Sequence, residues 1–148
     1  MDLQLTTPQP FHFREVLFAH GWLQLAPFRW DDDSGRLHRD DLLPNGAPCS
    51  WSLEATNGGL LLRAEAGEEW GPYLEARARW MLALDEDLAA FHRLCAGEPG
   101  LRRAAERGHG RLLRSPAVWE EVVKTLFSVN TTWKQTVAMT RRLVELCG

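Results

Sequence analysis

The chain has 148 residues, a net charge of −3 at neutral pH, 45% hydrophobic residues and 25% charged residues. These proportions are ordinary for a globular protein with a real hydrophobic core. No apolar run is long enough to span a membrane, and the N-terminus does not resemble a secretory signal. Three widely spaced cysteines argue against a disulfide or zinc framework and favour a reducing cytoplasm.

Charge is unevenly distributed along the chain. Residues 1–100 carry 8 basic and 16 acidic residues, a net charge of −8, whereas residues 101–148 carry 9 basic and 4 acidic residues, a net charge of +5. A basic C-terminal third fits an anionic partner at that end. A solvated charged surface is the commoner cause of such an imbalance, so charge alone leaves both interpretations open.

The first half of the chain predicts an antiparallel sheet. Residues 1–10 are polar and contain two prolines, so we expect a loose arm, followed by a short strand and a short helix over residues 11–18. Pro27 favours an edge strand or a bend within residues 23–30. Another strand is predicted over residues 36–43. Residues 51–56 and 60–66 alternate in polarity around a turn rich in asparagine and glycine, which is typical of a hairpin.

Helices are predicted from residue 68 onward. Residues 68–82 suit one helix, a second opens after the acidic residues 85–87 and ends near Gly97, and a third covers residues 99–107. The sequence therefore predicts an α+β fold. We expect a small antiparallel sheet domain with one or two helices over residues 1–80, and a helical part over residues 81–148.

Residues 111–148 predict two helices that meet at a polar corner. Ser115 is expected to cap the first helix, with Pro116 at its first helical position. One apolar face follows at helical spacing, made of Trp119, Val122, Val123, Leu126 and Phe127. A second apolar stripe begins at Trp133, and Gly148 falls where a C-cap glycine belongs.

Asn130, Thr131 and Thr132 form the corner itself. Their side chains favour caps and turns because they bond to nearby backbone groups. Backbone amides at the start of the second helix, with Lys134 one turn in, can contact an anion or a phosphate. A capped turn without a ligand is the commoner outcome of such a sequence.

Motifs for other kinds of chemistry are lacking. The five histidines are scattered, and none belongs to a nucleophilic triad motif. Zinc-hydrolase, zinc-deaminase, dinucleotide and P-loop motifs do not occur either. The aspartates at 31–33 indicate a solvated turn, and Glu120 and Glu121 are interpreted as solvated residues that complement the helix dipole. We expect no metal and no cofactor.

Several segments resemble DNA glycosylases of the helix-hairpin-helix superfamily, especially the bacterial and archaeal branch of 3-methyladenine and 8-oxoguanine DNA glycosylases. The matching segments are residues 20–22, 27–31, 108–116, 119–127, 128–133 and 136–139. They occur in the order of the family and together span most of the chain.

The resemblance implies a TBP-like sheet domain packed on a helical domain, and a function in base-excision repair. Such an enzyme hydrolyses the N-glycosidic bond of a damaged purine that is flipped out of double-stranded DNA. In the family, the helix-hairpin-helix and the catalytic Asp and Lys follow the matched segments. This chain is therefore expected to be the non-catalytic N-terminal part. The alternative is a standalone DNA-binding or protein-interaction module without catalytic activity.

The resemblance also implies contacts with DNA at the corner. Asn130 matches an asparagine that, in the oxoguanine branch, enters the space left by the flipped base. Thr131, Thr132 and Gln135 differ from the residues of that branch, and Leu25 stands where it has a glycine that reads the damaged base. Oxoguanine specificity is therefore not implied, and an alkylated purine is the alternative substrate.

The resemblance implies further site residues outside the corner as well. Leu25 and Phe28 are expected at the edge of the base pocket, and Lys134 at the DNA. Arg111 and Arg114 are expected to position the DNA backbone, or else to tie their own loop to a carboxylate inside the protein. The expected location is the cytoplasm, at the nucleoid.

Two further expectations concern apolar and aromatic residues. The stripe of the last helix needs a partner surface, so we expect marginal stability or self-association. The residues of this stripe are Trp133, Val137, Thr140 and Val144. Trp22 and Trp30 are the tryptophans considered for stacking on a base, although burial in the core is the favoured reading for both.

Overall fold

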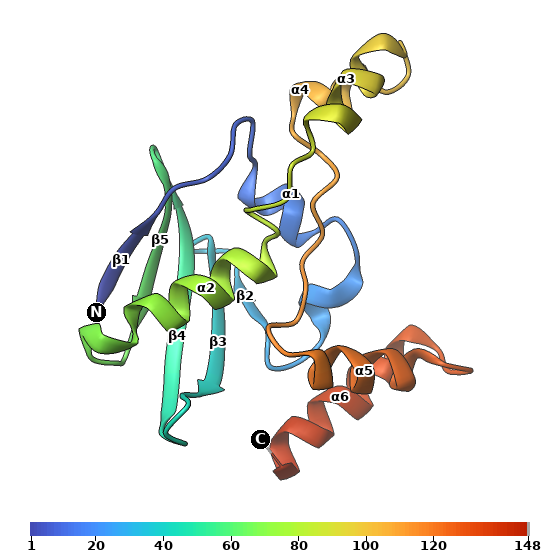
Figure 1. The fold of residues 1–148 in the computed structure, drawn as a ribbon. Coiled ribbons are helices and arrows are strands. Elements are labelled where there is room, and N and C mark those ends of the chain that lie inside the picture. Colours follow the sequence, from blue (N-terminus) through green and yellow to red (C-terminus); the bar gives the residue numbers. More distant parts are fainter. Residues whose placement is uncertain (148) are drawn as a thin grey trace.

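The computed structural model describes residues 1–147, which form a five-stranded sheet and six α-helices (Figure 1). The strands are β1 (Asp2–Leu5), β2 (Arg29–Asp31), β3 (Arg36–Leu42), β4 (Pro48–Thr56) and β5 (Gly59–Ala64). The helices are α1 (Phe13–Leu17), α2 (Gly71–Met81), α3 (Ala89–Gly97), α4 (Arg102–Glu106), α5 (Val118–Ser128) and α6 (Trp133–Cys147). Short 3-10 turns cover Gly21–Gln24 and Glu68–Trp70. The predicted α+β fold is confirmed.

All strands of the sheet are antiparallel, in the order β1-β5-β4-β3-β2. Their inward side chains alternate with outward polar ones, as expected for a sheet with one buried face. In the register of the central strands, Leu53 stands opposite Leu37 on one side and Leu62 on the other. This row of leucines forms the middle of the hydrophobic core.

Helix α2 lies across the buried face of the sheet (Figure 1). Leu74, Ala78 and Met81 recur at the spacing that places side chains on one face of a helix, and all three are fully buried. Pro72 stands in the first turn, where its missing N–H group costs no hydrogen bond. The predicted helix over residues 68–82 is thus confirmed, with its first residues in a 3-10 turn.

Four of the remaining five helices form two pairs. Helices α3 and α4 lie at one end of the molecule and α5 and α6 at the other, and the segment between α4 and α5 runs from one pair to the other past α1 (Figure 1). Arg114 fixes this segment to α2, because its backbone N–H donates to the Met81 carbonyl at 2.9 Å. No helix within residues 1–147 is both long and apolar enough to cross a membrane.

The prediction of a loose N-terminal arm was wrong, because residues 2–5 form the edge strand β1. This strand pairs with β5, with Leu5 opposite Leu60. The N-terminal ammonium group of Met1 also donates to the Ala64 carbonyl at 2.7 Å. Leu5 is fully buried, so burial of apolar surface outweighs the polar composition of this segment.

The predicted start of the helix after Ser115 was also wrong. Helix α5 begins at Val118, and Ser115 is a buried residue of the preceding segment. Its backbone N–H donates to the Glu121 carboxylate at 2.5 Å, and its hydroxyl accepts from Lys124 Nζ at 3.2 Å. Ser115 therefore bonds to side chains of α5 instead of capping it. The predicted C-cap at Gly148 lies outside the described residues.

Helix α5 buries its charged side and exposes its apolar side. Trp119 is 75% exposed and Leu126 is 63% exposed, whereas Lys124 is only 1% exposed. The apolar periodicity predicted the helix correctly but not the face that packs on this chain. The predicted domain boundary near residue 80 coincides with the end of α2 and stays a prediction.

The predicted hairpin is confirmed, with Thr56 paired to Gly59 across the turn. The left-handed region is occupied not by Asn57 or Gly58 but by Gly59, whose φ is +146°. A Cβ atom at Gly59 would lie 2.1 Å from the backbone oxygen of Leu5. Glycine is therefore required here by both the backbone conformation and the close approach of β1.

We expect Gly59→Ala to lower the free energy of unfolding by about 2 kcal/mol or more, which is roughly 4–8 °C in Tm. The added methyl group forces β1 away from β5. Gly58→Ala is the matched control, because a Cβ there meets no atom within 4 Å. Thermal unfolding of both variants tests this, and equal Tm values would contradict it.

Candidate functional site

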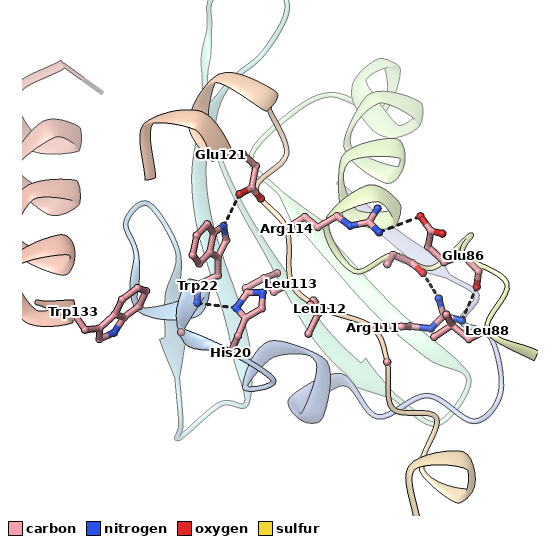
Figure 2. Close-up of a pocket in the computed structure, with 13 residues that line it drawn as sticks. His20, Trp22, Glu86, Leu88, Arg111, Leu112, Leu113, Arg114, Glu121 and Trp133 are labelled. Carbon is pink, nitrogen blue, oxygen red and sulfur yellow. Dashed lines mark hydrogen bonds and ion pairs between the residues drawn. The ribbon is translucent and has the colours of Figure 1, made fainter. Parts of the chain in front are cut away.

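A cavity of about 790 Å³ opens between the Gly21–Gln24 turn, the segment before α5 and the start of α6. Figure 2 shows Trp22, His20 and Trp133 on one side of it, and Arg111, Arg114 and Glu86 on the other. The cavity therefore has an aromatic wall and a charged wall.

The aromatic wall is held by hydrogen bonds at both indoles. The rings of Trp22 and Trp133 are inclined by 24° with centroids 6.5 Å apart. Trp22 Nε1 donates to Glu121 at 2.8 Å, and Trp133 Nε1 donates to Gln24 at 2.8 Å. The backbone N–H of Trp22 also donates to His20 Nδ1 at 3.0 Å. Both tryptophans thus have fixed positions with part of each ring exposed to the cavity.

Gly21 allows the close approach of Trp133 to the turn. A Cβ atom at Gly21 would lie 2.4 Å from Trp133 Cζ2. The indole of Trp133, the first residue of α6, therefore rests directly on the backbone at residue 21. This contact fixes the start of α6 against the aromatic wall.

The charged wall is built mainly from interactions within the protein. Arg111 is 6% exposed, and its guanidinium donates to the carbonyls of Ala83 and Glu86. Burial lowers the pKa of Arg111. Arg114 pairs with the Glu86 carboxylate at 3.1 Å and lies 4.9 Å from the Trp80 ring centroid. Arg114 therefore ties its loop to a carboxylate of the same chain, which is one of the two interpretations that the sequence left open. Arg111 instead binds backbone carbonyls.

The corner between α5 and α6 has the predicted capped turn. The backbone N–H of Thr132 donates to Gln135 Oε1 at 2.9 Å, and the backbone N–H of Gln135 reaches the Thr132 hydroxyl at 3.4 Å. This reciprocal pair is a capping box. Thr131 donates from its hydroxyl to the Phe127 carbonyl at 2.6 Å, so it bonds to the end of α5.

Asn130 occupies the tip of the corner with a φ of +54°. Asparagine is one of the few residues that adopt this left-handed conformation readily. Asn130 and Lys134 are both exposed, as are Thr131, Thr132 and Gln135. The structure thus brings all five predicted corner residues together on one surface. Trp133 lies within this set and also lines the cavity.

Leu25 and Phe28 lie in the core and do not line the cavity. Leu25 is fully buried, and Phe28 is 4% exposed. Two cations lie close to the Phe28 ring, with Arg39 Cζ at 4.8 Å and Lys124 Nζ at 4.4 Å from its centroid. Phe28 therefore packs against a charged cluster rather than against the cavity.

This cluster is a buried ionic network that the sequence did not predict. Arg39 of β3 pairs with Asp41 at 2.8 Å and with Glu120 at 2.5 Å. Lys124 pairs with the same Glu120 at 2.5 Å. Glu120 is therefore not the solvated residue expected from its place early in a helix. Its neighbour Glu121 likewise bonds to the protein, through Trp22 and Ser115.

The network sets the protonation of its members. Burial opposes the charge of Glu120, but hydrogen bonding and charge from Arg39 hold its pKa below the usual value. Burial lowers the pKa of Lys124, despite the attraction of Glu120. The π face of Phe28 attracts both cations. The ionised form of Glu120 is thus part of the folded state at neutral pH.

Neither the comparison with protein-family models nor that with curated proteins finds a match. Among solved structures, the chain is similar to a 3-methyladenine DNA-glycosylase from Archaeoglobus fulgidus, with a TM-score of 0.75 and 14% sequence identity. The likeness covers 98% of this chain and 50% of that one. The chain thus spans about half the length of the glycosylase structure, and at this identity the likeness shows a glycosylase-like fold.

We expect Glu120→Gln to lower the free energy of unfolding at pH 7 by about 3 kcal/mol, because it leaves Arg39 and Lys124 without their shared carboxylate. Glu145→Gln, at an exposed carboxylate of α6, is the control. The folded state lowers the pKa of Glu120, so its contribution is present above about pH 4.5 and is lost as the pH falls through the folded pKa. Chemical denaturation at several pH values measures this, and a difference that grows in acid would contradict it.

We expect Gly21→Ala to displace Trp133 and to lower the free energy of unfolding by about 1–3 kcal/mol, because the methyl group overlaps the indole. Gly97→Ala is the control, since a Cβ there meets no atom within 4 Å. The indole N–H signal of Trp133 in an NMR spectrum reports the broken bond to Gln24. An unchanged signal in Gly21→Ala would rule out the close contact.

Proposed function

We propose that this chain is the DNA-gripping part of a DNA-repair glycosylase that acts on a damaged purine. The observation that carries the proposal is the exposed polar corner of Asn130 and Lys134 beside an aromatic cavity, on a fold similar to that of a DNA glycosylase. Its partner is double-stranded DNA with a damaged base, in the cytoplasm.

The corner has the properties of a phosphate contact. It stands at the N-terminus of α6, a helix of 15 residues, where the helix dipole attracts negative charge. Lys134 adds an exposed cation in the first turn. Asn130 at the tip supplies an amide that can donate to or accept from a base edge. These groups support contact with both the backbone and a base.

The cavity beside the corner supports a place for an extruded base. Enzymes that act on a base in a duplex take it out of the stack and hold it against aromatic or apolar side chains. Trp22 and Trp133 offer such faces, and Trp133 connects the cavity to the corner. Electron-rich indole faces also attract cations. An alkylated purine that carries positive charge is therefore the substrate that fits this wall best.

The second candidate is a standalone DNA-binding or protein-interaction module. The chain spans about half the length of the similar glycosylase. The family resemblance also assigns the catalytic Asp and Lys to a later part of its members. As part of a glycosylase or as a DNA-binding module, the purified 148-residue chain binds DNA without releasing a base, whereas a protein-interaction module does neither. Release of an alkylated base by this chain alone would overturn that assignment.

We expect Lys134→Ala to weaken DNA binding and to reduce the slope of log affinity against log salt by about 1, because one phosphate contact is lost. Fluorescence anisotropy at several salt concentrations measures both. Arg142→Ala is the matched control, since Arg142 is exposed on α6 two turns away. Equal effects of Lys134→Ala and Arg142→Ala would show that the corner is not the contact.

Asn130→Ala is expected to weaken binding to a duplex with an abasic site more than to an intact duplex.

A further inference from the structure

A second cavity, of about 600 Å³, adjoins the first. Gly110, Arg111 and Leu112 line both cavities, so this short segment is a wall that the two share. One end of the combined groove is Trp133, next to the polar corner. The other end reaches α4 and the loop that follows it. The two cavities are therefore neighbours along this segment, and together, as the groove, they extend from the corner toward α4.

The two ends of the groove differ in charge. In the first cavity, Arg111 and Arg114 are balanced by Glu86 and Glu121. In the second, Arg103 and Arg107 face one carboxylate, that of Glu15, together with His12 and His109. The first cavity is thus aromatic and balanced, and the second carries an excess of positive charge.

Glu15 holds the basic end in place. Its carboxylate accepts from Arg107 Nε at 2.5 Å and bonds to His109 Nε2 at 2.6 Å. The hydrogen bond from Arg107 is the main reason that the pKa of Glu15 falls to about 2, so this carboxylate is ionised at neutral pH. The backbone at Gly108 is fixed as well, because its φ is +65° and a Cβ there would lie 2.1 Å from the Pro10 oxygen.

Arg103 is left available at this end. It is exposed, and within the described residues neither Arg103 nor its neighbour Arg102 forms an ion pair. Both lie on α4, the helix that directly precedes the loop that Glu15 fixes. The groove thus ends in a fixed basic loop with unpaired guanidinium groups beside it.

We propose that this basic end is a second phosphate-binding region, which holds the backbone of a nucleic acid strand beyond the corner. The inference rests on the proposed function and deepens it, because it assigns a path to the bound strand. Aromatic faces flanked by positive charge are the combination that proteins use to hold a strand by its bases and its backbone. Arg103 contacts a phosphate, Arg107 and His109 shape the floor, and Trp22 and Trp133 lie between this region and the corner.

An acidic peptide would use the arginines but not the aromatic wall, so the groove as a whole favours a nucleic acid. A bound strand that runs from the corner to the basic end would also bring its negatively charged phosphates to the positive charges at both places. The corner beside the first cavity supplies the exposed Lys134. The second cavity supplies Arg103, while the charges of the first cavity are balanced.

The test compares Arg103→Ala with Arg93→Ala, an exposed arginine of α3 that lines neither cavity. Affinity for a duplex with an abasic site is measured by anisotropy between low and high salt. Arg103→Ala is expected to reduce the salt slope by about 1, with Arg93→Ala unchanged and Arg103→Lys restoring most of the slope. Because Arg103 is exposed, the variant keeps the fold, and a thermal melt verifies this.

The outcomes separate the two proposals. If the chain binds DNA and Lys134→Ala weakens it, but Arg103→Ala behaves like Arg93→Ala, the second region is refuted and the proposed function stands. If the chain shows no salt-dependent DNA binding, the proposed function fails with it. If Arg103→Ala abolishes binding of an oligoglutamate peptide and leaves DNA binding unchanged, the basic end is a peptide site and the inference is overturned.

Discussion

The ion pairs of Glu120 with Arg39 and Lys124 are the constraint that holds α5 and the segment after it against the sheet. Arg39 belongs to the sheet, and Glu120 and Lys124 belong to α5, so the network joins the sheet to the helix that leads to the corner. The next residue, Glu121, holds Trp22. Two adjacent carboxylates therefore fix α5, the aromatic wall and, through Trp133, the start of α6.

This constraint also explains why α5 exposes its apolar face. A carboxylate and an ammonium group lose hydration when they are buried, and only close pairing offsets the cost. Once α5 turns Glu120 and Lys124 toward Arg39 and Phe28, its opposite face carries Trp119, Val122 and Leu126 outward. The helix is amphipathic in the usual way, but its charged side is the one that packs on this chain.

Local patterns predicted local structure. The hairpin around Asn57 and the capped corner at Thr132 follow from turn and cap chemistry within a few residues, and the order of predicted strands and helices led to the fold class. The ionic network joins Arg39 to a residue 81 positions later, so no pattern along the chain reveals it. The available signal for the network was Lys124, because it is a charged residue that stands among apolar ones in the sequence. Its burial is explained only by its ionic partners. Strand β1 was missed because its burial depends on pairing with β5, far along the chain.

The pair of helices α3 and α4 has a thermodynamic consequence of its own. Within the described residues, Cys95 is the one buried hydrophobic side chain in these two helices, and the bond between His92 and the His109 carbonyl is among the few that join them to the loop beyond. Segments with few buried contacts open at a small fraction of the global unfolding free energy. This helical hairpin is therefore a unit that can detach while the sheet stays intact. Its mean position in solution is set by a small free-energy difference, which a molecule bound to its arginines can shift.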